Sequence, residues 1–162
     1  MGDHAQKNVW DNQDLENVLL RGGVAVMPTD TIYGIVGRAQ DARVVNRIYE
    51  IRKRNPEKPC IVLISNMKDL EKFSIFISEE QKSSISKYLE PTSFILDCED
   101  EKFFYLHRGM HTLAFRIPNI KELRDLLLKP GPLIAPSANT EATPPSTNVQ
   151  DARKYFGDKV DL

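Results

Sequence analysis

The chain has 162 residues, of which 41% are hydrophobic and 28% are charged. That length supports one domain with its own core, and the balance is typical of a globular protein. Lysine and arginine total 22 against 23 aspartates and glutamates, so no overall basic excess marks a nucleic-acid binder, although a local basic patch is compatible with these totals. We expect a single domain over residues 1–162, with residues 1–10 flexible.

The composition also bears on compartment and metals. The first residues lack an apolar signal core and no apolar run approaches a membrane span, so we expect a cytoplasmic protein without a membrane partner. Cys60 and Cys98 lie in apolar runs and are expected to be small core residues rather than a disulfide. With three histidines and no Cys-x-x-Cys pair, we expect no metal bound by protein side chains.

The first predicted elements are a helix, a strand and a second helix. Residues 12–21 place apolar side chains on one helical face, and Gly22-Gly23 follows as a stop. Residues 24–27 form a short apolar strand. Asp41 is expected to cap a helix that ends in the basic run 52–54.

The later elements predict a layered α/β domain. Cys60–Ile64 is a continuous apolar run, as expected of a strand covered on both faces. A short helix is expected from Asn66, and Ser78–Gln81 is a capping box that opens another helix. Strands are predicted at 93–98, 103–107, 112–117 and 133–135, with helices at 119–128 and 148–156. Helices alternating with strands, followed by a run of strands, indicate a mixed sheet flanked by helices.

A dense polar stretch, residues 28–34, follows the first strand. It contains Thr29, Asp30, Thr31 and Tyr33, whereas strand interiors favour apolar and β-branched residues. One interpretation is a Pro-Thr-Asp turn with capping side chains. The other is a binding edge of the sheet.

A second polar stretch, residues 135–140, also follows a strand. Ser137 could cap a turn or donate its hydroxyl to a phosphate. The chain has no Gly-x-Ser-x-Gly, no P-loop and no Gly-x-Gly-x-x-Gly motif. An inventory of hydroxyls, arginines and lysines with few bases suits a reaction run by positioning and charge neutralisation, such as transfer at a nucleotide phosphate.

The cations allow two interpretations. Arg52, Lys53, Arg54 and Lys58 lie within seven residues. They could offset the dipole at a helix end, or they could form a clamp for phosphate or carboxylate. Arg116 could likewise be an ordinary surface arginine or a contact for an acidic ligand.

Six segments, in this order, resemble the YrdC-like family of threonylcarbamoyl-AMP synthases. The segments that show the resemblance are Pro28–Gly34, Ile48–Arg54, Lys58–Ile64, Pro91–Phe94, Thr112–Pro118 and Ala135–Asn139. The resemblance as a whole covers roughly residues 12–160. The resemblance implies an open, twisted mixed sheet flanked by helices, with a concave basic cavity.

The same resemblance implies an activity. The family condenses L-threonine, bicarbonate and ATP into threonylcarbamoyl-AMP and pyrophosphate, with Mg²⁺ accompanying ATP, for tRNA modification. Its implied partners are the downstream tRNA threonylcarbamoyl-transfer proteins, with weak RNA binding in addition.

The implied site residues fall into three groups. Arg52 and Arg54 are implied to be catalytic. Threonine is implied to contact Thr31, Tyr33, Arg116 and Ala135. ATP is implied to contact Arg54, Lys58, Ser93, Thr112, Ser137 and Asn139.

This sequence departs from the family pattern at three places. Arg52 stands where the family has lysine, so a planar, forked guanidinium replaces a compact ammonium group at this position. Residues 88–91 replace a Trp-Pro-Gly-Pro turn, and the family's usual C-terminal segment, with its Asp-Gly-Gly turn, is absent from residues 1–162. Two alternatives therefore stay open: a non-catalytic module that binds nucleotide or double-stranded RNA, and a partner-binding remnant.

Overall fold

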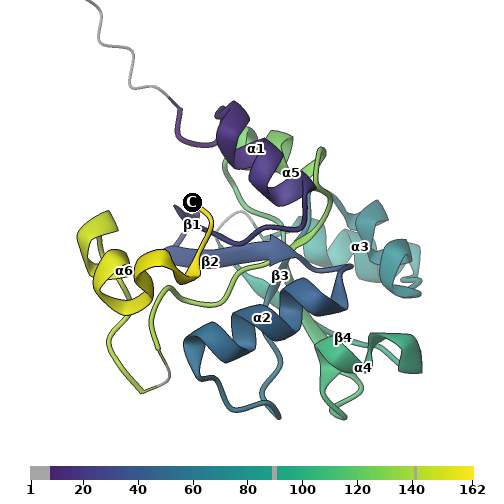
Figure 1. The fold of residues 1–162 in the computed structure, drawn as a ribbon. Helices are drawn as coiled ribbons and strands as arrows, with labels where there is room; N and C mark the ends of the chain where they lie inside the picture. Colours follow the sequence, from purple (N-terminus) through teal and green to yellow (C-terminus); the bar gives the residue numbers. More distant parts are fainter. Residues whose placement is uncertain (1–7, 89–90, 141) are drawn as a thin grey trace, which may run out of the picture.

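Six strands in the described part of the chain form one mixed sheet (Figure 1). The structure is a computed structural model, described for residues 8–88, 91–140 and 142–162. The strand order is β1-β2-β6-β3-β5-β4. Only β3 and β5 pair in parallel, and the other neighbours are antiparallel. The strands are β1 (Ala25–Pro28), β2 (Tyr33–Arg38), β3 (Val62–Leu63), β4 (Ser93–Asp97), β5 (Thr112–Arg116) and β6 (Leu133–Ile134).

Side-chain caps begin most of the helices. Asn12, Asp41, Asn66 and Asn148 each accept a backbone N–H at a helix start, and Ser78 forms a complete capping box. The α-helices are α1 (Gln13–Leu20), α2 (Ala42–Arg52), α3 (Glu79–Ser86), α4 (Phe104–His107), α5 (Lys121–Leu127) and α6 (Val149–Phe156). The 3₁₀ helices are η1 (Met67–Phe73), η2 (Glu101–Phe103) and η3 (Gly157–Lys159).

Helices cover both faces of the sheet. Val45 and Ile48 of α2 join the core on one face, together with Phe115 of β5. On the other face, Leu19 of α1 and Leu123 of α5 pack with a second apolar cluster. Figure 1 shows α1 and α5 together on the side of the sheet opposite α2. The fold is thus the layered α/β arrangement that the sequence predicts.

The last residues of the chain lie along β1 (Figure 1). Val26 N–H donates to the carbonyl of Leu162 at 2.9 Å, and Asp161 N–H donates to the carbonyl of Val24 at 2.7 Å. The Asp161 carboxylate also accepts from Arg47 Nη1 at 2.6 Å. That hydrogen bond, with one from the Val24 amide, lowers the pKa of Asp161.

One predicted strand is wrong. Residues 103–107 form the end of η2 and all of α4, because Phe103, Leu106 and His107 are the buried positions and this spacing fits a helix. The strand predicted at 60–64 is only Val62–Leu63, and the helix predicted from Asn66 is a 3₁₀ helix. The predicted flexibility of residues 1–10 falls mostly outside the described residues, and the predicted turn at 88–91 lies partly outside them.

Candidate functional site

The register of β4 and β5 brings several predicted site residues onto one face. Alternate residues of a strand point to the same side, so Thr112, Ala114 and Arg116 share a face. Ser93 pairs with Arg116 across the two strands, and Asp97 pairs with Thr112. Positions 93, 95 and 97 are exposed, so this end of the face is open to solvent.

The second polar stretch continues the same face. Leu63 of β3 pairs with Arg116 on one side and with Leu133 on the other. If every second residue after Leu133 points to the same face, the next two are Ala135 and Ser137. Both are residues for which the family resemblance implies a contact, Ala135 with threonine and Ser137 with ATP. Ala135 N–H donates to the carbonyl of Ile61 at 3.0 Å. Thr112 and Arg116 of β5 therefore lie on one side of the sheet, and the same alternation, continued past the end of β6 at Ile134, puts Ala135 and Ser137 on that side.

The first polar stretch meets this face through Arg116. Arg116 Nε donates to Asp30 Oδ1 at 3.0 Å, and its Nη2 lies 2.9 Å from the same oxygen. Nη2 also donates to Thr31 Oγ1 at 3.3 Å. The Asp30 side chain is 2% exposed and that of Arg116 is 10% exposed. Asp30 thus holds the guanidinium in one orientation, with Thr31 beside it.

The two polar stretches also join through the backbone. Gly34 and Ser137 form an isolated β-bridge, and Ala138 N–H donates to the carbonyl of Tyr33 at 2.9 Å. A side chain at position 34 would approach Thr29 Cγ2 at 3.2 Å, closer than most real contacts. Glycine therefore permits the close approach of the two stretches here.

Arg52 reaches this junction from the end of α2. Its Nε donates to the carbonyls of Ser137 and Asn139, at 2.9 and 3.1 Å, and its Nη2 donates to Ser137 Oγ at 3.3 Å. Arg52 is 2% exposed although it is charged. The Asn139 side chain is also buried, and its Nδ2 donates to the carbonyls of Thr140 and Thr143. Arg52 and Asn139 therefore shape the loop that presents Ser137.

The remaining predicted cations lie beside a tyrosine. Arg54 donates to the carbonyls of Lys58 and Pro59, at 3.2 and 2.7 Å, while Lys58 itself is exposed. The Tyr49 hydroxyl also donates to the carbonyl of Lys58. Arg54 lies 5.8 Å from the centre of the Tyr49 ring, and Arg108 lies over the same ring at 3.7 Å. Burial is the main cause that raises the pKa of Tyr49, so the phenol stays neutral.

Two residues of this region were not predicted from the sequence. Asp30 is the acidic residue beside the predicted threonine contact Thr31, and that adjacency is a signal that could have found it. Arg108 joins the cations through a turn more than fifty residues downstream, and no motif in the sequence indicates that contact.

A cavity opens where the parallel strands end. It has a volume of about 310 Å³ and is lined by residues that follow β3 and β5, including Ser65, Asn66 and Ile117. The crevice beyond the carboxyl ends of parallel strands is a common place for a ligand. Arg116 and the other predicted site residues are not among those that line this cavity, although Ile117, the next residue after Arg116, is.

The chain was compared with known proteins. A family model for the Sua5, YciO and YrdC proteins, described as "Telomere recombination", matches residues 17–162. The threonylcarbamoyl-AMP synthase of Hahella chejuensis is 30% identical, over 95% of this chain and 85% of its own length. The threonylcarbamoyl-AMP synthase of Pyrococcus abyssi is 27% identical over 94% of this chain but only 45% of its own length.

Solved structures agree with this result. The structure of P. abyssi Sua5 complexed with L-threonine superposes with a TM-score of 0.78 at 26% identity, covering 91% of this chain and 44% of that one. The solution structure of MTH1692 from Methanobacterium thermoautotrophicum has a TM-score of 0.71 at 26% identity, covering 100% of this chain and 78% of that one.

Fold and site together define an α/β protein with an arginine- and hydroxyl-lined face at one end of a mixed sheet. The chain belongs to the Sua5/YciO/YrdC family. The predicted family and the predicted fold class are thereby confirmed. Among the described residues, no helix is both long and apolar enough to cross a membrane.

Proposed function

We propose that this chain is an L-threonylcarbamoyladenylate synthase, which condenses L-threonine, bicarbonate and ATP into threonylcarbamoyl-AMP, pyrophosphate and water. Its relatives of that name support the proposal: they cover more than nine-tenths of this chain. The chain spans 45% of the P. abyssi relative and 82% of that from Chromohalobacter salexigens. Mg²⁺ comes with the triphosphate, and the product passes to proteins that transfer the threonylcarbamoyl group to tRNA in the cytoplasm.

The single observation that carries the proposal is the oriented guanidinium of Arg116. Its Nε and Nη2 both meet Asp30, and Nη2 also touches Thr31 Oγ1. A planar guanidinium held by one carboxylate can offer its remaining N–H groups to a second one, such as that of an amino acid. We assign the carboxylate of threonine to Arg116, and place Thr31, Tyr33 and Ala135 around the rest of that substrate.

The nucleotide is assigned to the other end of the same face. Ser137 and Thr112 offer hydroxyl donors there, and Lys58 and Asn139 are assigned to the same substrate. Ser93, which pairs with Arg116, would contact the nucleotide from the threonine end of the face. Arg52 and Arg54 supply positive charge beside it, which offsets charge on the α-phosphate while the carbamate oxygen attacks and pyrophosphate leaves. Arg52 acts through the Ser137 loop that its hydrogen bonds hold.

The test is pyrophosphate release that requires ATP, L-threonine and bicarbonate together. Loss of one charge-assisted contact costs about 1.5–3 kcal/mol, or roughly 10- to 150-fold, so Arg54→Ala is expected to lower the rate in that range. Arg43→Ala is the matched control, because Arg43 is an exposed arginine at the start of α2, the helix that ends just before Arg54. It should leave the rate unchanged.

Two results would contradict the proposal. One is no release above background at high protein concentration, with Arg54→Ala indistinguishable from the parent. The other is RNA binding with a steep salt dependence and no ATP binding, which favours the nucleic-acid-binding alternative.

A further inference from the structure

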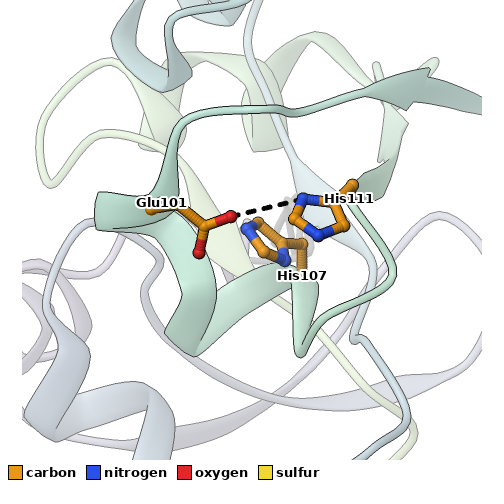
Figure 2. A group of neighbouring side chains, drawn as sticks. All are labelled: Glu101, His107 and His111. Carbon is orange, nitrogen blue, oxygen red and sulfur yellow. Dashed lines mark ion pairs between the residues drawn. The ribbon is translucent and has the colours of Figure 1, made fainter.

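A second polar cluster lies on the connection between β4 and β5. The imidazole cluster consists of Glu101, His107 and His111, and Figure 2 shows the three side chains facing one another. One ligand atom from each lies within 4.8 Å of the other two. Glu101 Oε1 is 3.5 Å from His111 Nδ1, and the centres of the two imidazole rings are 4.7 Å apart. Three good metal ligands therefore converge on one point.

The base of the imidazole cluster is a buried histidine. His107 is fully buried, and within the described residues its Nε2 has no hydrogen-bond partner. His111 Nδ1 is also buried without a hydrogen-bond partner there. Buried polar atoms in proteins almost always have a partner, and an unsatisfied one is unfavourable. Two unsatisfied nitrogens that face a carboxylate indicate that a cation completes the group.

The backbone builds this arrangement through a tight turn. Helix α4 ends at His107, and Arg108, Gly109 and His111 all have positive φ values, of 55°, 86° and 56°. This turn folds the chain back, so the ring of His111 stacks near that of His107. The carbonyl of His111 accepts from Cys98 N–H at 2.8 Å, which fixes the end of the turn to β4's exit. Such conformations are uncommon for arginine and histidine and occur often at ligand sites.

We propose that Glu101, His107 and His111 bind one divalent transition-metal ion of the Zn²⁺ class. Two imidazoles and a carboxylate are a common ligand set for such ions, and water would take the open position. With metal–ligand bonds of 2.0–2.1 Å, neighbouring ligands of a tetrahedral ion lie about 3.4 Å apart, close to the Glu101–His111 separation. Glu101 is 68% exposed, so its side chain can move to close the site. This proposal is independent of the proposed synthase activity.

Coordination has one consequence for His107. Its Nδ1 now accepts from Gly109 N–H at 3.1 Å, so a neutral ring carries its proton on Nε2. When a metal binds Nε2, the neutral ring carries its proton on Nδ1 instead. Nδ1 can then no longer accept a hydrogen bond, so the hydrogen bond from Gly109 N–H must break. The Gly109 amide is thus a direct reporter of metal at this ring.

The experiment is calorimetric titration of Zn²⁺ into the full chain, purified without a polyhistidine tag and stripped of metal. We expect one ion per chain, and a melting temperature that rises with Zn²⁺ concentration. His111→Asn and Glu101→Gln should each weaken binding more than about 10-fold, since even indirect partners of a ligand contribute that much. Asparagine tolerates the positive φ at position 111, so the turn is retained.

Matched variants make the assignment specific. His4→Asn removes the third histidine of the chain and Cys98→Ser removes the nearby thiol, and both should bind Zn²⁺ as the parent does. Glu99→Gln tests the other carboxylate, whose Oε2 lies 3.9 Å from His111 Nδ1, and should have little effect. Mg²⁺ should bind far more weakly than Zn²⁺, because it prefers oxygen ligands.

Nuclear magnetic resonance gives a second measurement, at a single residue of the proposed site. With one equivalent of Zn²⁺ the amide of Gly109 should shift in the parent and shift less in His111→Asn. The proposal is overturned if neither His111→Asn nor Glu101→Gln weakens binding, if binding needs Cys98 or His4, or if the Gly109 amide does not respond.

Discussion

The Arg116 pair and the imidazole cluster are polar groups at opposite ends of β5, and they differ in how their charged and polar atoms are paired. Arg116 leaves the C-terminal end of β5 and meets Asp30 Oδ1 at two nitrogens, so the two opposite charges are paired, although Asp30 Oδ2 is buried without a hydrogen-bond partner among the described residues. The imidazole cluster precedes the N-terminal end of β5 and leaves two buried nitrogens without partners in the described structure. A paired buried charge is already fixed in place, whereas an unpaired buried nitrogen still needs a ligand.

The two groups should also differ in how strongly a substitution in them lowers the stability of the fold. Asp30 and Arg116 are both almost fully buried, so each depends on the other for its compensation. The side chains of Glu101 and His111 are 68% and 44% exposed, so water can solvate the Glu101 carboxylate when no metal is bound, although His111 Nδ1 itself is buried. Substitutions in the Arg116 pair should therefore affect folding strongly, and those at the rim of the imidazole cluster should affect it little. Arg116→Ala and Glu101→Gln test this contrast at its two ends, and Arg52→Lys adds a buried arginine between them in expected effect.

The largest effect is expected from Arg116→Ala. It leaves the Asp30 carboxylate buried without its cation, which should lower the free energy of unfolding by about 3–5 kcal/mol in urea denaturation. The variant should also lose the rise in melting temperature given by threonine while it keeps most of the rise given by ATP. Equal loss of both rises would contradict the assigned roles.

A double-mutant cycle isolates the pair in that experiment. Asp30→Ala/Arg116→Ala removes both charges, so it should be clearly less destabilised than the sum of the two single variants. Strict additivity would mean that the two side chains do not stabilise each other.

These two groups also show what the sequence can predict. The fold class and the capped helices follow from local patterns, because caps and apolar periodicity act over a few residues. The shared face of Arg116 and Ser137 was not predicted, because it depends on the pairing of β3 with β5 and β6. The pairing of Arg116 with Asp30 depends on side chains 86 positions apart, and only the folded sheet brings them together.

The imidazole cluster was missed for a different reason. His107 and His111 have the His-x-x-x-His spacing that suits a metal on a helix, but the prediction that no metal is bound overlooked this pair, and residues 103–107 were predicted as a strand. In the structure the helix ends at His107, and the left-handed turn rather than a helical face brings the rings together. Turns of this kind depend on tertiary contacts, which the local sequence does not specify.

A smaller effect is expected from Arg52→Lys, which restores the residue type implied by the family resemblance. Lysine keeps the charge but cannot reproduce a fork whose Nε meets two carbonyls while Nη2 meets Ser137 Oγ. The free energy of unfolding should fall by about 1–3 kcal/mol, measured in urea. The response of the melting temperature to ATP should weaken, because the Ser137 loop loses its anchor. Arg43→Ala on the same helix should change neither quantity.

The smallest effect is expected from Glu101→Gln in metal-free protein. The His111–Glu101 contact is long, at 3.5 Å, and both side chains are substantially exposed, so the free energy of unfolding should change by less than about 1 kcal/mol. With Zn²⁺ present the free energy of unfolding should be higher for the parent than for Glu101→Gln, because only the parent gains the full stabilisation of the bound ion. Urea denaturation with EDTA and with Zn²⁺ measures both states. A large destabilisation in EDTA would show that Glu101 is needed for folding itself, and the contrast with Arg116 would then fail.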